Sequence, residues 1–259
     1  MSGFLATHAV FRLDELAQVF PGTPVALKES LRYHVGAGHL LRVRRGLYAT
    51  VPRGRNPATA SPDVFLLASR MTGDAVLAFH TALEFYGRAY STRQDSTVWS
   101  AAPARPFEFR GQHFRVVVPS GATARQRSRS GVEETERQGL KLRVTTLERT
   151  LVDVLDRPDL AGGWEEVWRS LESIEFFDLD QVVHHVRLLK NATTAARVGF
   201  YLEQHAQALQ VDEAHLRALR RLRPKQPRYM DGARGGKWVA AWSLVVPEDV
   251  YGRSWEEPT

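Results

Sequence analysis

Cysteine is absent from this 259-residue sequence, and long hydrophobic runs are absent as well. Without cysteine the protein has no disulfide bond, no thiolate metal site and no cysteine nucleophile, which is compatible with a reducing compartment. No apolar run approaches the roughly 20 residues that a membrane-spanning helix needs. The N-terminal residues also lack the positive start and apolar stretch of a secretory signal. We therefore expect a cytoplasmic protein without a membrane segment.

Catalytic motifs are missing too, since the sequence contains no HExxH, GxSxG or P-loop pattern. His184 and His185 are adjacent, so on a helix their side chains point about 100° apart and are poorly placed to hold one metal ion. His80 lies in an apolar stretch, where a histidine is more often part of the core. The acidic residues 132–137 lack the strand context that a metal-dependent nuclease needs. We expect no catalytic residue, no metal, no cofactor and no enzyme activity.

Positive charge, by contrast, is plentiful. Lysine and arginine number 35 against 29 aspartate and glutamate residues, which gives a formal net charge of +6. Much of this charge is arginine, whose planar guanidinium group suits phosphate better than the point charge of lysine does. With 43% hydrophobic residues, the chain is long enough to bury a core and to divide into two units. These properties indicate a globular protein with a polyanionic partner.

The first 52 residues predict a small helical unit followed by a basic hairpin. A short helix over residues 3–11 precedes an amphipathic helix over residues 12–20, which ends at Pro21 and Gly22. A further helix then begins with Thr23 as its cap, and its buried stripe is predicted to consist of Leu27, Leu31 and Val35.

The stretch HLLRVRRGLYAT, residues 39–50, alternates in the manner of a β-hairpin that turns at RRG. No acidic residue occurs between Glu29 and Asp63. The order helix, turn, helix, basic hairpin is typical of a winged helix-turn-helix, in which the second helix enters the major groove and the hairpin contacts phosphates. The side chains expected to contact DNA are Lys28, Ser30, Arg32, Tyr33, His34, Arg42, Arg44, Arg45 and Tyr48.

Three of these assignments have an alternative. A run of arginines is often an ordinary solvated face, although the local absence of acids favours contact with DNA for the hairpin. Tyr48 either packs in the core of the hairpin or lends its hydroxyl group to a phosphate. A shift of the helix by one residue would also change which of its side chains face the groove.

The remaining chain predicts a linker over residues 53–62 and a mixed domain over residues 63–259, so that the fold class is α+β. Helices are expected at DVFLLASRM and AVLAFHTALEFYG, and a small sheet at STVWSA, FEFRG, QHFRVVVP and LKLRVTT. Residues 120–139 between two of the strands are expected to form a polar loop. A bundle of amphipathic helices follows from Thr146, and the tail after residue 228 returns to a strand pattern.

The order of these parts resembles the AbiEi antitoxins of AbiE-type abortive-infection systems, which are type IV toxin–antitoxin systems. The likeness is carried by LLRVRRGLYAT, the linker, AVLAFHTALEFYG and RVTTLERTLVDVL, and it covers nearly the whole chain. It implies a repressor whose winged helix binds inverted repeats in its own promoter. It also implies a C-terminal domain that serves in neutralising a nucleotidyltransferase toxin, so that operator DNA and such a toxin are the expected partners.

Other functions compete with this one. The family also contains stand-alone regulators without a toxin, and a nuclease or hydrolase domain joined to a DNA reader is a further alternative. The six tryptophans would suit a protein-interaction scaffold, but they are equally suited to a core. The basic cluster RALRRLRPKQPR, residues 217–228, fits DNA, an acidic partner or an ordinary solvated surface.

Overall fold

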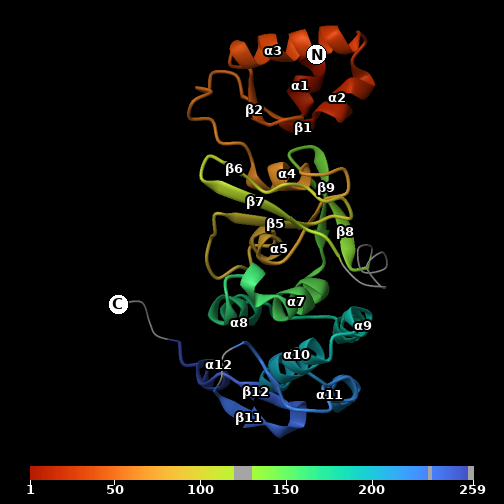
Figure 1. Ribbon diagram of the computed structural model, residues 1–259, viewed down its shortest axis with the longest axis vertical. Helices are drawn as coiled ribbons and strands as arrows, with labels where there is room; N and C mark the ends of the chain where they lie inside the picture. Colours follow the sequence, from red (N-terminus) through yellow and green to blue (C-terminus); the bar gives the residue numbers. More distant parts are fainter. Residues whose placement is uncertain (120–129, 233–234, 256–259) are drawn as a thin grey trace. The chain divides into compact units, whose positions relative to one another are not determined.

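A computed structural model describes residues 1–119, 130–232 and 235–255, and these residues form a mixed α+β fold (Figure 1). The chain divides into two compact units. The first consists of Met1–Leu77, Arg93–Val118 and Glu133–Val144, and the second of Ala78–Thr92, Pro119–Val132 and Thr145–Thr259. The expected linker over residues 53–62 therefore lies inside the first unit. The arginines of the expected polar loop at positions 125, 127 and 129 lie outside the described residues.

The N-terminal part of the first unit holds three helices and a three-stranded antiparallel sheet. Its elements are α1 (Ser2–Thr7), β1 (Val10–Arg12), α2 (Leu13–Val19), α3 (Pro24–Gly36), β2 (Leu40–Arg44) and β3 (Leu47–Thr50). The strand order is β1-β3-β2. The predicted helix over residues 3–11 is wrong in its second half, because the β-branched and aromatic residues Val10 and Phe11 pair with β3 as a strand.

Capping and apolar spacing explain α3. The Thr23 hydroxyl accepts a hydrogen bond from the Ala26 N–H at 3.2 Å, and Pro24 occupies the first turn. Leu27 and Leu31 are buried in one core with Phe11, Leu16, Leu40 and Tyr48, while Val35 packs at its edge. The predicted cap and buried stripe are confirmed.

A six-stranded sheet completes the first unit, with α4 (Val64–Ser69) packed against it. Its strands are β4 (Val76–Leu77), β5 (Asp95–Trp99), β6 (Phe107–Phe109), β7 (Gln112–Val117), β8 (Val132–Arg137) and β9 (Leu140–Thr145). The strand order is β6-β7-β5-β4-β9-β8.

Two sequence predictions are wrong in this sheet. AVLAFHTALEFYG is not one helix. Its start forms strand β4, and Phe79, whose φ of 55° is not helical, separates this strand from α5 (His80–Phe85). Residues 132–137 are not loop but strand β8, which turns into β9 through Gln138 and Gly139, both with positive φ. Because β4 is buried, its sequence lacks the alternation of apolar and polar residues that identifies a strand. Strand β8 contains three glutamates, a residue that is uncommon in strands.

The second unit is a helical bundle with a small sheet. Its helices are α5, α7 (Leu147–Asp156), α8 (Trp164–Glu172), α9 (Leu179–Leu189), α10 (Ala192–Gln204), α11 (Glu213–Arg220) and α12 (Glu248–Gly252), and its strands are β10 (Arg228–Tyr229), β11 (Lys237–Val239) and β12 (Leu244–Val246). Helix α7 begins at the predicted cap Thr146, whose side chain accepts from the Arg149 N–H. Trp168, Tyr201 and Trp242 are fully buried, so these aromatic residues belong to the core.

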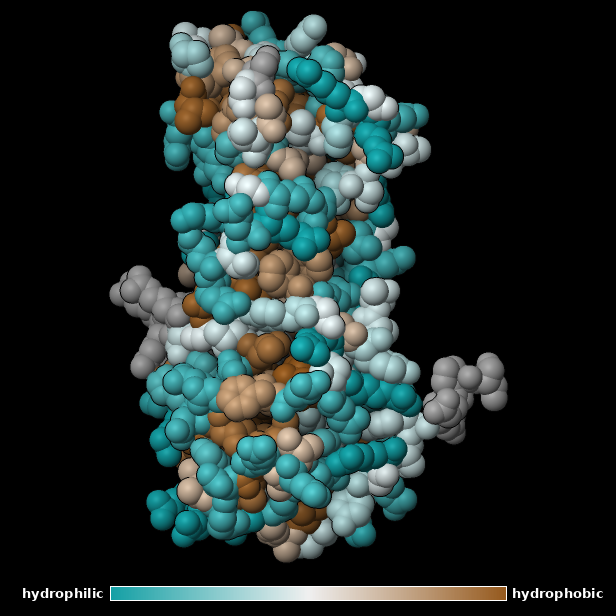
Figure 2. Space-filling model, turned by 180° about the vertical axis from the view of Figure 1, so that it is seen from behind, coloured by the Kyte–Doolittle hydropathy of each residue, from teal (hydrophilic) through white to brown (hydrophobic). Residues whose placement is uncertain are grey.

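Most large apolar side chains are covered in both units. On the face drawn in Figure 2, hydrophilic residues (teal) dominate and hydrophobic residues (brown) appear in separate patches. The exposed large apolar residues include Val25, Tyr33, Phe176, Tyr229 and Trp238. Among the described residues, no helix combines the length and the apolar character that crossing a membrane requires.

Candidate nucleic-acid interface

Helix α3 turns one face to its core and the other to solvent. Lys28, Arg32 and Tyr33 are exposed, with 66% of the Tyr33 surface accessible, while Ser30 and His34 lie at the margin and are half-buried. This is the arrangement predicted from the apolar spacing. Glu29 is also exposed on this helix, so its outer surface carries one negative charge beside its two positive charges.

His34 has a partner that the sequence did not indicate. Its Nδ1 lies 3.3 Å from the Nδ1 of His39, which follows the helix in the turn before β2. Partial burial, the neighbouring His39 and the chain's amino terminus together lower the pKa of His34. The imidazole therefore favours the neutral form, which can exchange a hydrogen bond but adds no charge near neutral pH.

The hairpin β2–β3 presents two of its three predicted arginines to solvent. The chain turns at Arg45 and Gly46, where Gly46 has φ 80°, and both Arg42 and Arg45 are exposed. No carboxylate of the described residues lies within ion-pair distance of Lys28, Arg32, Arg42 or Arg45. The charge of these four side chains is thus not neutralised within the described parts of the chain.

Arg44 is directed toward its own protein, in contrast to the expectation that it contacts DNA. It donates hydrogen bonds to the carbonyl oxygens of Met71 and Arg105, and its guanidinium carbon lies 4.7 Å from the centre of the Phe107 ring. Burial and the nearby Arg12 lower its pKa. A register shift in the β2–β3 pairing between Arg42 and Arg44 disturbs the simple alternation on which the prediction relied.

Tyr48 is likewise a core residue and not a surface contact. Only 8% of its surface is exposed, and its ring stacks on Phe11 at a centroid distance of 5.7 Å. Of the two roles weighed for this residue from the sequence, the structure therefore supports packing. Arg44 and Tyr48 are therefore not among the side chains available to DNA.

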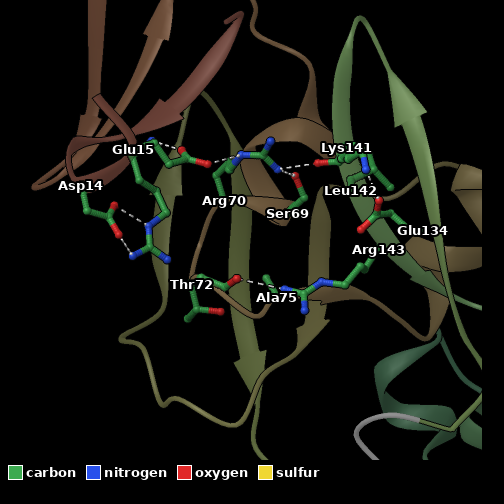
Figure 3. Close-up of a pocket in the computed structure, with 12 residues that line it drawn as sticks. Asp14, Glu15, Ser69, Arg70, Thr72, Ala75, Glu134, Lys141, Leu142 and Arg143 are labelled. Atoms are coloured by element: carbon green, nitrogen blue, oxygen red, sulfur yellow. Dashed lines mark hydrogen bonds and ion pairs between the residues drawn. The ribbon is translucent and has the colours of Figure 1, made fainter. Parts of the chain in front are cut away.

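A cavity of about 360 Å³ in the first unit has a densely charged wall (Figure 3). Most of these charged side chains form ion pairs with one another. Arg12 pairs with Asp14, Arg70 pairs with Glu15 at 3.1 Å, Lys141 pairs with Glu134 at 2.7 Å, and Arg143 donates to the Gly73 carbonyl oxygen at 2.9 Å. Burial acts against ionisation of Asp14, but the hydrogen bond and the charge of Arg12, together with backbone hydrogen bonds, outweigh it and lower the Asp14 pKa. Three of the four cations of the wall are thus paired with carboxylates, and Arg143 is held by a backbone carbonyl, so most of this charge is compensated within the first unit.

The second unit contains a buried histidine–carboxylate cluster. His80 is 2% exposed, as expected of a core histidine, and its Nε2 lies 2.9 Å from Glu166 Oε1. The same carboxylate accepts from the N–H and hydroxyl groups of Ser91 and from the Ser170 hydroxyl. Burial raises the Glu166 pKa, but the hydrogen bonds from His80 and Ser91 prevail and lower it to about 2.

This cluster has the wrong order for nucleophilic catalysis. In a catalytic triad the histidine lies between serine and acid, whereas here Glu166 lies between Ser91 and His80. On α9, His185 is buried and His184 is exposed, and their rings meet edge to face with centroids 5.5 Å apart. Across residues 1–119, 130–232 and 235–255, no three potential metal-ligating side chains come together.

Comparisons with known proteins bear on the fold. No protein-family model matches the sequence, and no curated protein matches it. The chain is similar in structure to the RV2827C protein from Mycobacterium tuberculosis, known from a crystal structure, with a TM-score of 0.59 and 18% sequence identity. The match covers 96% of this chain and 90% of that chain. At this identity the likeness shows that the two proteins share a mixed α+β fold over nearly their whole lengths.

Proposed function

We propose that the protein is a transcriptional repressor that binds double-stranded DNA through its N-terminal part, with α1 to β3 acting as a winged helix-turn-helix. Helix α3 is the recognition helix in this proposal and the β2–β3 hairpin is the wing. The observation that carries the proposal is the set of exposed cations on these two elements, Lys28, Arg32, Arg42 and Arg45, which have no carboxylate partner among the described residues.

The two elements are suited to different parts of a duplex. An α-helix fits the major groove, where Arg32 has the geometry to donate two hydrogen bonds to a guanine edge and Tyr33 and Lys28 flank it. Arg42 and Arg45 on the hairpin are suited to phosphates, which fix register and orientation without reading sequence. Leu31 of α3 and Leu40 and Tyr48 of the hairpin belong to one hydrophobic core. This shared core holds the helix and the hairpin together as one DNA-binding surface.

The resemblance to the AbiEi antitoxins supplies the biological setting of the proposal. Two copies bind an inverted repeat upstream of the protein's own gene and repress it, and the protein neutralises a nucleotidyltransferase toxin. A stand-alone regulator without a toxin would use the same DNA-binding surface. A nucleotidyltransferase reading frame immediately beside the gene is the observation that separates these two roles.

Titration of the purified protein against the DNA upstream of its gene tests the proposal. The measurement is fluorescence anisotropy at two salt concentrations, with unrelated duplex as competitor. We expect binding that resists the competitor and weakens steeply with salt, because every neutralised phosphate releases counterions. Equal affinity for upstream and unrelated duplex would contradict sequence-specific repression.

A further inference from the structure

The basic cluster over residues 217–228 separates into two parts in the structure. Arg220 pairs with Glu203 and Glu213, and Arg217 donates to the Glu213 carbonyl oxygen, so both arginines are engaged within their own unit. The remaining cations, Arg221, Arg223, Lys225 and Arg228, have no ion pair with any described carboxylate. The second half of the cluster is therefore an uncompensated positive surface of the second unit.

A cavity of about 580 Å³ lies at this positive surface. Its wall includes Lys190, Lys225 and Arg228, the uncharged residues 191–193 and Pro224, and no carboxylate of the residues that the structure describes. Asp156 accepts hydrogen bonds from the side chains of Asn191 and Thr194 but does not line the cavity. Three cations around an acid-free cavity are suited to the phosphate groups of a ligand.

An exposed aromatic row begins at the residue next to Arg228. Tyr229 on β10 and Trp238 on β11 both pair with Val245 on the central strand β12, so the three side chains form one row across the sheet. The neighbours of Val245 on β12, Leu244 and Val246, are fully buried and show which face is the inner one. Tyr229 and Trp238 are 51% and 48% exposed on the outer face.

The spacing of the row suits stacked bases. Neighbouring strands lie about 4.8 Å apart, so the two aromatic residues on the outer strands are about 10 Å apart across the sheet. Each ring thus has room for one base on its face. Arg228, which lines the cavity, and Tyr229 are consecutive on the outer strand β10, and their side chains alternate in direction because Arg228 pairs with Leu244 and Tyr229 with Val245. The cations and the rings therefore share this edge of the sheet. Exposed aromatic rings and cations together are the combination that single-stranded nucleic acids bind, through stacking and phosphate contacts.

We propose that the second unit binds single-stranded nucleic acid, with bases stacked on Tyr229 and Trp238 and phosphates held by Lys190, Lys225 and Arg228. The observations favour this ligand over an acidic protein because charge alone would not require a row of flat rings. This surface belongs to the second unit, whereas α3 and the hairpin belong to the first, so the proposal is independent of repression by the N-terminal part.

Anisotropy of labelled single strands tests the proposal on the full-length protein. The probes are RNA and DNA strands of about 12 nucleotides and mixed sequence, with poly-glutamate as a competitor that carries charge without bases. We expect the Y229A/W238A variant to bind the strands at least tenfold more weakly, and the K225A/R228A variant to bind more weakly with a flatter salt dependence. Poly-glutamate should compete poorly.

Two matched controls come from the same unit. Phe176 is 76% exposed and Arg187 is an exposed cation on α9, and the F176A and R187A variants should bind like the wild type. The Y229F/W238F variant keeps the rings and should keep the affinity, which separates stacking from loss of folding. The R42A/R45A variant should also bind single strands normally, so failure of the duplex proposal leaves this result interpretable.

Three results would overturn the inference. The first is an absence of single-strand binding by the wild type up to about 100 µM protein. The second is unchanged affinity in Y229A/W238A when its circular dichroism and thermal melting match the wild type. The third is equal competition by poly-glutamate, which would make the surface a site for acidic polypeptides.

Discussion

Gly199 on α10 lies directly against the indole ring of Trp242. A Cβ atom at position 199 would be 2.1 Å from Cζ3 of that ring, well inside van der Waals contact. Trp242 is fully buried, and its Nε1 donates to Glu203 on the same helix at 2.7 Å. A glycine in the middle of a helix costs about 1 kcal/mol relative to alanine, so the close approach of the indole explains why this position lacks a side chain.

Gly199→Ala should therefore destabilise the protein even though alanine favours helix. We expect the free energy of unfolding to fall by about 1 to 3 kcal/mol, the usual cost of overpacking a core. Urea unfolding measures it. Gly36→Ala is the control, because a Cβ at that position of α3 meets no atom within 4 Å. Equal stability of G199A and the wild type would contradict the packing described here.

Substitutions of Tyr48 test whether this residue packs in the core or contacts DNA. Tyr48→Ala should lower the free energy of unfolding by about 3 to 5 kcal/mol, since it removes a buried ring that stacks on Phe11. Tyr48→Phe should leave both stability and DNA affinity close to those of the wild type. A marked loss of DNA affinity in folded Y48F would instead assign the hydroxyl to a phosphate.

Arg44 should behave differently from Arg42, its neighbour two residues earlier. Arg44→Ala removes hydrogen bonds to the Met71 and Arg105 carbonyl oxygens and should cost about 1 to 2 kcal/mol of stability. The salt dependence of DNA binding should not change in this variant. Arg42→Ala should show the reverse pattern, and identical behaviour of the two variants would refute the distinction.

Acid should destabilise the second unit through protonation of His185. Burial and the charge of Arg149 lower the pKa of His185 to about 4, whereas an unfolded histidine has a pKa of about 6.5. As pH falls through that window, the unfolded chain takes up a proton that the folded protein does not. Stability should therefore decrease by up to about 1.4 kcal/mol per pH unit between pH 6.5 and 4.

Urea unfolding across this pH range checks the effect. His185→Gln should remove much of the slope, while His184→Gln, at an exposed position of the same helix, should retain it. Coincident profiles for H185Q and the wild type would show that His185 is not the group that senses acid.

Local patterns predicted helix α3 and the β2–β3 hairpin. The spacing of Leu27 and Leu31, the Thr23 cap and the RRG turn each depend on neighbours within a few residues, and each is confirmed. The exposure of Lys28 and Arg32 followed from the same helical period. Such features are readable from sequence because short-range geometry decides them.

Long-range contacts account for what the sequence did not reveal. The direction of Arg44 depends on Met71 and Phe107, which lie far along the chain, and a register shift between Arg42 and Arg44 alters the alternation. His80 hydrogen-bonds with Glu166, which is 86 residues away. The aromatic row of Tyr229 and Trp238 likewise arises only when their separate strands pair with β12.

The salt dependence of duplex binding, compared between the wild type and the R42A/R45A variant, tests the central claim most directly. The logarithm of affinity falls with the logarithm of salt concentration by about 0.9 for each phosphate neutralised, so loss of two contacts should flatten the slope by about 2. R187A serves as the control and should keep the wild-type slope. A slope and affinity for upstream DNA that are the same in R42A/R45A and the wild type would contradict a DNA-binding role for the hairpin.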